Sequence, residues 1–157
     1  MKKIVVYIIS ILIPLGIGAL SGFLSSPGME EYMMAAVKPP LSPPEWLFPV
    51  VWSILYVLLG ISLGIVLNKE TVTKDAKFIT TAFFGLNLAI NFLWSIWFFV
   101  FNLYTFSFIW ILLLIVSTVI LAMSFYASSK VAGLLQIPYI LWLIFAAYLN
   151  LAVSILN

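Results

Sequence analysis

The sequence predicts an all-α integral membrane protein whose single domain is a bundle of five transmembrane helices. Of its 157 residues, 65% are hydrophobic and only 8% are charged, which leaves too few polar side chains to cover a soluble domain. Uncharged runs of about 20 residues, enough to cross the roughly 30 Å hydrocarbon core, recur along the chain. Stretches such as IWILLLIVSTVILAM are apolar on every side, whereas membrane β-strands alternate apolar and polar residues. The predicted helices cover residues 4–26, 46–67, 78–101, 104–126 and 133–156 of one domain, residues 1–157.

The first predicted helix, residues 4–26, follows Lys2 and Lys3. A secretory signal peptide also begins with positive charge, but its apolar core is only about 7 to 15 residues long. Here the apolar run continues through Leu24, which makes it long enough to span a bilayer. We therefore expect this segment to be retained as a transmembrane helix.

Prolines concentrate in the first connection, residues 27–45, which is the one long loop of the predicted bundle. Its Pro39-Pro40 and Pro43-Pro44 pairs remove backbone donors and restrict φ, so we expect a semi-rigid segment. A long loop in a small protein is more often functional than idle. Two interpretations stay open, a lid over a pocket, which we favour, and a plain rigid connector.

The second predicted helix, residues 46–67, has one face that mixes aromatic and small residues. The members of this face recur every three or four residues and are Pro49, Trp52, Tyr56, Gly60 and Gly64. Tryptophan near a helix end usually lies at the membrane interface, but Trp52 lies deeper, and we expect it to line a pocket. The glycine pair permits close approach of another helix, within the bundle or in a dimer.

The third and fifth predicted helices carry comparable stripes of aromatic and amide side chains. These are Asn87, Asn91 and Trp94 in the third helix, and Pro138, Trp142, Ala146 and Leu149, followed by Asn150, in the fifth. Asparagine in the middle of a membrane span either bonds helices together or binds a ligand, and both readings stay open for these residues. Trp142 is aligned with polar positions, so we expect it to face a pocket.

The fourth predicted helix, residues 104–126, has short connections to its neighbours, so these helices are expected to pack as antiparallel hairpins. A cytoplasmic N-terminus places six of the seven lysines inside and leaves only Lys38 outside. The six are Lys2, Lys3, Lys69, Lys74, Lys77 and Lys130. The positive-inside rule therefore predicts that the N-terminus is cytoplasmic and the C-terminus lies outside.

Composition also excludes several classes of chemistry. The chain has no Cys, His or Arg, which excludes disulfides, thiolate or imidazole metal sites and histidine acid/base catalysis. We expect no metal site, no cofactor and, because the lysines are scattered, no nucleic-acid partner. No Asp, Glu or Lys lies inside a predicted span, which argues against an ion-driven carrier. The remaining reading is a site for a large, flat, apolar molecule with a few polar groups.

Three blocks of the sequence resemble the translocator protein family, also called tryptophan-rich sensory proteins or peripheral-type benzodiazepine receptors. These blocks are KPPLSPPEWLFPVVWSILYVLLG, LNLAINFLWSIWFF and IPYILWLIFAAYLNLAVSILN, in that order. The resemblance covers nearly the whole chain and implies a five-helix bundle in a bacterial cell membrane, often dimeric. It further implies a pocket beneath the first connection that accepts protoporphyrin IX and benzodiazepine-site ligands.

The resemblance also implies a set of ligand-binding residues, carried over position by position. These are Tyr32 in the first connection, Trp52 and Tyr56, Asn87, Asn91 and Trp94, and Trp142, Ala146 and Leu149. Trp52 and Trp142 are expected to flank the ligand and to be the redox-active residues. The implied function is a porphyrin receptor that promotes light- and oxygen-dependent porphyrin breakdown, an activity credited to some family members. Two alternatives stay open, a facilitative transporter of tetrapyrroles or other amphiphiles, and a ligand-dependent sensor or scaffold without catalysis.

Overall fold

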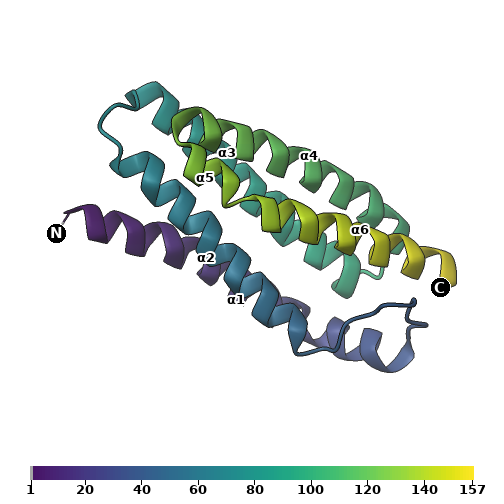
Figure 1. The fold of residues 1–157 in the computed structure, drawn as a ribbon. Helices are drawn as coiled ribbons and strands as arrows, with labels where there is room; N and C mark the ends of the chain where they lie inside the picture. Colours follow the sequence, from purple (N-terminus) through teal and green to yellow (C-terminus); the bar gives the residue numbers. More distant parts are fainter. Residues whose placement is uncertain (1) are drawn as a thin grey trace.

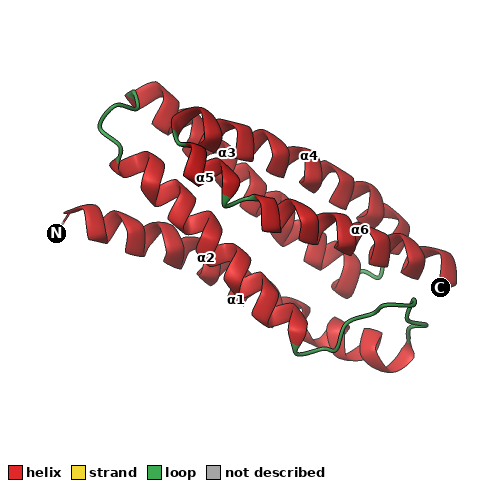
Figure 2. Cartoon of the chain, viewed as in Figure 1, coloured by secondary structure: helices red, strands yellow, loops and turns green. Residues whose placement is uncertain are grey.

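The computed structural model describes residues 2–157, all of whose regular structure is helical (Figures 1 and 2). Five segments are long and apolar enough to cross a membrane, which confirms the predicted all-α membrane fold. The helices are α1 (Lys2–Ala35), α2 (Leu47–Asn68), α3 (Lys74–Ser95), the π-helical turn η1 (Ile96–Val100), α4 (Tyr104–Ser128), α5 (Lys130–Leu134) and α6 (Ile137–Leu156).

The bundle is elongated, and the two ends of the chain lie at opposite ends of it (Figure 1). Helix α1 packs mainly against α2, while α4 packs against both α3 and α6. The connection of residues 36–46 and the end of α6 share one end of the bundle, and α5 lies at the other. Two structural halves result, an α1/α2 pair and an α3/α4/α6 layer.

The predicted end of the first helix at residue 26 is wrong, because α1 continues through Pro27 to Ala35. Proline at position 27 cannot donate the backbone hydrogen bond that the carbonyl of Phe23 normally receives. The Ser26 Oγ donates to that carbonyl at 2.9 Å instead, so the helix loses no partner there. The expected loop of residues 27–45 is therefore shortened to residues 36–46, and Tyr32 lies in the helix rather than in the loop.

The third predicted helix starts earlier than expected, at Lys74 rather than residue 78. Thr73 caps it, since its side chain accepts a hydrogen bond from the backbone N–H of Ala76 at 3.2 Å. The acidic Asp75 in the first turn complements the helix dipole. At its other end the helix changes to the π form of η1, which periodicity does not reveal.

The fifth predicted helix, residues 133–156, is divided in the structure into α5 and α6. Pro138 occupies the first turn of α6, where its missing N–H requires no partner. Proline would clash with a helical carbonyl four residues earlier, so the continuous helix is interrupted just before it. The second and fourth helices lie within two residues of their expected bounds, at Leu47–Asn68 and Tyr104–Ser128.

Helices α1 and α2 touch backbone to backbone at the glycine stripe. A Cβ atom on Gly60 would lie 2.5 Å from both the Ile11 Cα and the Ser10 carbonyl oxygen. A Cβ atom on Gly64 would overlap the ring of Tyr7. Both glycines therefore serve close packing inside the bundle, which is one of the two roles expected for them.

Candidate ligand-binding pocket

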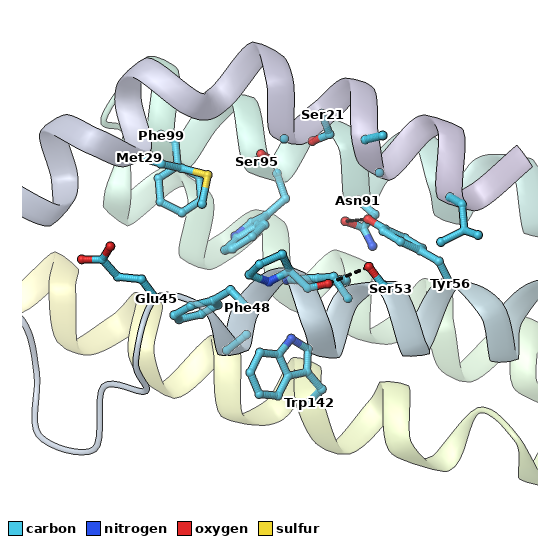
Figure 3. A pocket seen from close by; sticks show the side chains of 18 residues that line it. Ser21, Met29, Glu45, Phe48, Ser53, Tyr56, Asn91, Ser95, Phe99 and Trp142 are labelled. Carbon is cyan, nitrogen blue, oxygen red and sulfur yellow. Dashed lines mark hydrogen bonds between the residues drawn. The ribbon is translucent and has the colours of Figure 1, made fainter. Parts of the chain in front are cut away.

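A cavity of about 570 Å³ lies between α1, α2, α3 and α6, near the connection of residues 36–46 (Figure 3). This volume is within the usual range for small-molecule sites. Its lining is mainly aromatic and small side chains: Leu15, Gly18, Ala19, Ser21, Gly22, Met29, Glu45, Phe48, Pro49, Trp52, Ser53, Tyr56, Asn91, Trp94, Ser95, Phe99, Trp142 and Ala146. The cavity therefore suits a ligand with large apolar faces.

The aromatic wall is centred on Trp52 of α2. Its ring centroid lies 5.6 Å from that of Tyr56 and 6.4 Å from that of Trp94, both at small interplanar angles. Tyr139, which does not line the cavity, backs Trp52 edge-on at 6.2 Å. Because its neighbours fix the Trp52 ring, the wall is formed before any ligand arrives.

Trp142 of α6 contributes a second indole to the same cavity. Its ring packs edge-on against Phe48 of α2, with centroids 6.0 Å apart. Its Nε1 is buried and has no hydrogen-bond partner among the described residues, in contrast to the Trp94 Nε1, which donates to Asn150 Oδ1 at 3.0 Å. Buried donors are normally paired, so the Trp142 N–H is available to an acceptor on a ligand.

The remaining polar groups of the lining are sparse and mostly bonded within the protein. The Tyr56 hydroxyl donates to Asn91 Oδ1 at 3.4 Å, and Ser53 Oγ donates to the Pro49 carbonyl at 2.7 Å (Figure 3). The first of these bonds is long, so a ligand can compete for either group. Glu45 carries the one formal charge in the lining.

The wall formed by α1 is thin because its lining residues are small. A Cβ atom on Gly18 would overlap the ring of Tyr56, so the glycine lets that ring lie close to the helix. At Gly22 a Cβ atom would meet nothing within 4 Å. Small residues on α1 thus leave room for the cavity between this helix and the aromatic wall.

The structure brings six of the nine expected site residues to the cavity, namely Trp52, Tyr56, Asn91, Trp94, Trp142 and Ala146. The other three, Tyr32, Asn87 and Leu149, are not in the lining. Tyr32 packs edge-on against Phe98 and Phe99, with centroids 5.4 and 5.8 Å away, and so supports the wall from behind. Leu149 is buried in the α6 packing.

Asn87 is wholly buried and bonds helices to one another. Its Nδ2 donates to Thr118 Oγ1 at 2.8 Å, and its Oδ1 accepts from the Tyr139 hydroxyl at 3.1 Å. Asn150 likewise links Trp94 to the backbone of α4, donating to the Tyr104 carbonyl at 2.8 Å. For these two asparagines the structure favours the interhelical reading, whereas Asn91 both bonds Tyr139 at 2.7 Å and faces the cavity.

Several lining residues were missed, and one of them carries a signal in the sequence. Phe48 lies four residues before Trp52 and therefore shares its face of α2. Phe99 lies five residues after Trp94, a spacing that an α-helix would place elsewhere. The π turn of η1 brings it back to the same face, with the two ring centroids 6.2 Å apart. Only the structure reveals that shift.

Comparison with known proteins assigns this architecture. Residues 10–156 match the TspO/MBR family. The chain belongs to this family. A tryptophan-rich protein TspO from Chlorobaculum tepidum is 32% identical over 99% of the chain and 98% of its own length. Another from Archaeoglobus fulgidus is 35% identical over 94% of each chain, and the translocator protein of Ovis aries is 29% identical over 72% of this chain and 67% of its own.

The lining sets the chemistry that a TspO/MBR pocket of this composition can offer. Its functional groups are indole, phenol, amide, hydroxyl and the Met29 thioether, with the Glu45 carboxylate at one end. Indole rings stack on flat apolar molecules and are the most readily oxidised groups present. The site can therefore enclose a ligand, orient it through a few hydrogen bonds and exchange an electron with it.

Proposed function

We propose that this TspO/MBR protein is a membrane receptor for tetrapyrroles of the protoporphyrin IX class. The observation that carries the proposal is the common cavity of Trp52, Trp94 and Trp142, in which a flat macrocycle has indole faces to pack on. The volume of about 570 Å³ and the thin wall of α1 support a ligand of that shape. The same cavity suits the flat aromatic ligands of the benzodiazepine site.

We further propose that Trp52 and Trp142 donate electrons to the bound porphyrin when it is excited by light, with dioxygen as the final oxidant. The Trp142 Nε1 has no hydrogen-bond partner among the described residues, and the Trp52 ring packs at tilted angles against Tyr56 and Trp94. Both indoles thus lie where a ligand makes van der Waals contact with them. The reduced porphyrin passes this electron to dioxygen, which becomes superoxide, and the oxidised indole recovers an electron from the porphyrin. The porphyrin is thereby left oxidised by one electron and open to attack by the superoxide, which starts its breakdown.

The test is a titration of the purified protein with protoporphyrin IX, followed by absorbance in matched dark and illuminated samples. The variants Trp52→Phe and Trp142→Phe keep much of the stacking surface and lose the oxidisable indole. We expect saturable binding, a light-dependent product with the wild type, and a product rate that falls several-fold further than affinity does in either variant. Trp46→Phe is the matched control, because Trp46 is 65% exposed and outside the cavity.

Three outcomes separate the candidate functions. Parallel loss of affinity and photoproduct in the two variants contradicts the electron-transfer role. Saturable binding with no photoproduct leaves a receptor or a carrier, which counterflow of porphyrin in proteoliposomes then distinguishes. The absence of saturable binding contradicts the receptor itself.

A further inference from the structure

The charge of the cavity lining is one-sided. Glu45 is a carboxylate, and no lysine is among the lining residues. The chain contains no arginine at all. An anionic group on a ligand therefore finds no positive partner inside the cavity, whereas a cationic group finds a negative one.

Glu45 is not neutralised by a neighbour. Among residues 2–157, the only ion pair joins Lys3 to Glu70 at 3.2 Å, in a different part of the protein. The end of the bundle that carries Glu45 also carries Glu30 and Glu31 in the last turns of α1, and Lys38 is the one lysine of that region. Acidic residues therefore outnumber lysines at this end of the bundle, and the field around Glu45 is negative.

The position of Glu45 places its charge beside aromatic faces. Its side chain lies at the end of the cavity near Met29 and Phe48, just before α2 begins at Leu47 (Figure 3). A cation in that position is attracted by the carboxylate and by the electron-rich faces of the neighbouring rings. Glu45 is exposed, so solvent and salt screen these attractions in part.

We propose that Glu45 makes the pocket selective for flat aromatic ligands that carry a protonated amine at this end, over ligands that carry a carboxylate there. The inference rests on the proposed function, since it assumes that the cavity binds such flat molecules. Within the proposed tetrapyrrole class, it ranks amine-bearing derivatives above neutral ones and neutral ones above dicarboxylates.

The experiment uses three ligands that share one macrocycle: protoporphyrin IX, its uncharged dimethyl ester, and its bis-amide with two aminoethyl arms. Each is titrated in the dark in non-ionic detergent into the wild type, Glu45→Gln, Glu45→Lys and Glu31→Gln. Glu31→Gln is the matched control, because it removes the same charge from the same end of the bundle outside the cavity. Affinity for the uncharged ester shows that each variant retains a folded pocket.

In the wild type we expect the amine to bind most tightly, the ester next and the dicarboxylate least tightly. Glu45→Gln should reduce the amine-to-dicarboxylate ratio by about threefold to fivefold, the size expected of one partly exposed charge pair. Glu45→Lys should reverse the order, and Glu31→Gln should leave it nearly unchanged. Added salt should shrink the wild-type ratio.

The proposal is overturned if Glu45→Gln keeps the wild-type ratio, or if Glu31→Gln changes it equally, since the selectivity would then come from the general surface field. A wild-type preference for the dicarboxylate would overturn it as well. If all three ligands bind but are not discriminated, this inference fails while the receptor function stands. If none binds saturably, both fail.

Discussion

Between α3, α4 and α6 the buried amides and hydroxyls bond to one another, whereas the cavity between α1, α2, α3 and α6 is lined mainly by aromatic and small side chains with few polar groups. In the first region Asn91 donates to Tyr139 at 2.7 Å, Tyr139 to Asn87 at 3.1 Å, and Asn87 to Thr118 at 2.8 Å. We call these four residues the polar ladder. In the second region the Trp142 Nε1 has no hydrogen-bond partner within residues 2–157.

The difference indicates that the two regions of the bundle have different roles, one in stability and one in ligand binding. Apolar burial does little to hold helices together in lipid, so packing and hydrogen bonds such as those of the polar ladder do so instead. The cavity gives up such contacts and leaves a donor unpaired, which lowers stability but leaves that donor to a ligand. Asn91 belongs to both regions. The other three residues of the polar ladder should therefore control stability, and the rest of the cavity lining should control binding.

Breaking the polar ladder should give the largest effect. Asn87→Leu leaves the Tyr139 hydroxyl without its acceptor inside the bundle, and we expect a loss of about 2 to 3 kcal/mol in the free energy of unfolding. The measurement is thermal or denaturant unfolding in detergent. Asn68→Leu is the control, because Asn68 makes only a bond to the Lys3 carbonyl near the bundle surface, and it should change stability by about 0.5 kcal/mol or less.

Asn87 lies outside the cavity lining, so affinity for protoporphyrin IX should be unchanged in the Asn87→Leu variant at temperatures where it remains folded. A large loss of affinity in the folded variant would contradict the division between the two regions.

The contact between α1 and η1 offers the next largest effect, because it joins the two regions. A Cβ atom on Gly28 would overlap the backbone carbonyl of Phe99, a cavity residue. Gly28→Ala should therefore move α1 away from η1 and cost about 1 to 3 kcal/mol of stability. Unlike Asn87→Leu, it should also weaken ligand binding, which the same titration measures.

Gly16→Ala is the matched control in the same helix, since a Cβ atom there meets nothing within 4 Å. That variant should be neutral or slightly stabilised, because alanine favours a helix over glycine. Equal destabilisation by the two alanines would mean that helix propensity, and not the contact with Phe99, explains the effect.

The sequence predicts the five spans well, because length and apolar composition decide them. It predicts the site less completely. Asn87 and Asn91 lie one turn apart on the same stripe, yet only Asn91 reaches the cavity, since the exact rotation of α3 against its neighbours decides which amide is enclosed. Tyr32 was expected in a loop because the apolar run of the first helix ends soon after Leu24, and the Ser26 hydrogen bond that lets the helix continue past Pro27 depends on a side-chain rotamer.

The smallest effect should separate two tryptophans of the same cavity. Trp94→Phe removes the donor to Asn150 Oδ1, leaving that oxygen unpaired, and should cost about 1 kcal/mol in the ligand-free protein. Trp142→Phe removes a donor that has no partner, so its hydrogen-bond loss should be close to zero and only a small packing change remains. Unfolding without ligand measures both.

With protoporphyrin IX bound, the order of the two costs should reverse if the Trp142 N–H pairs with the ligand. Trp142→Phe then leaves the hydrogen-bond acceptor on the ligand unpaired. Equal costs in the free protein would mean that ring packing, rather than hydrogen-bond pairing, distinguishes the cavity from the polar ladder.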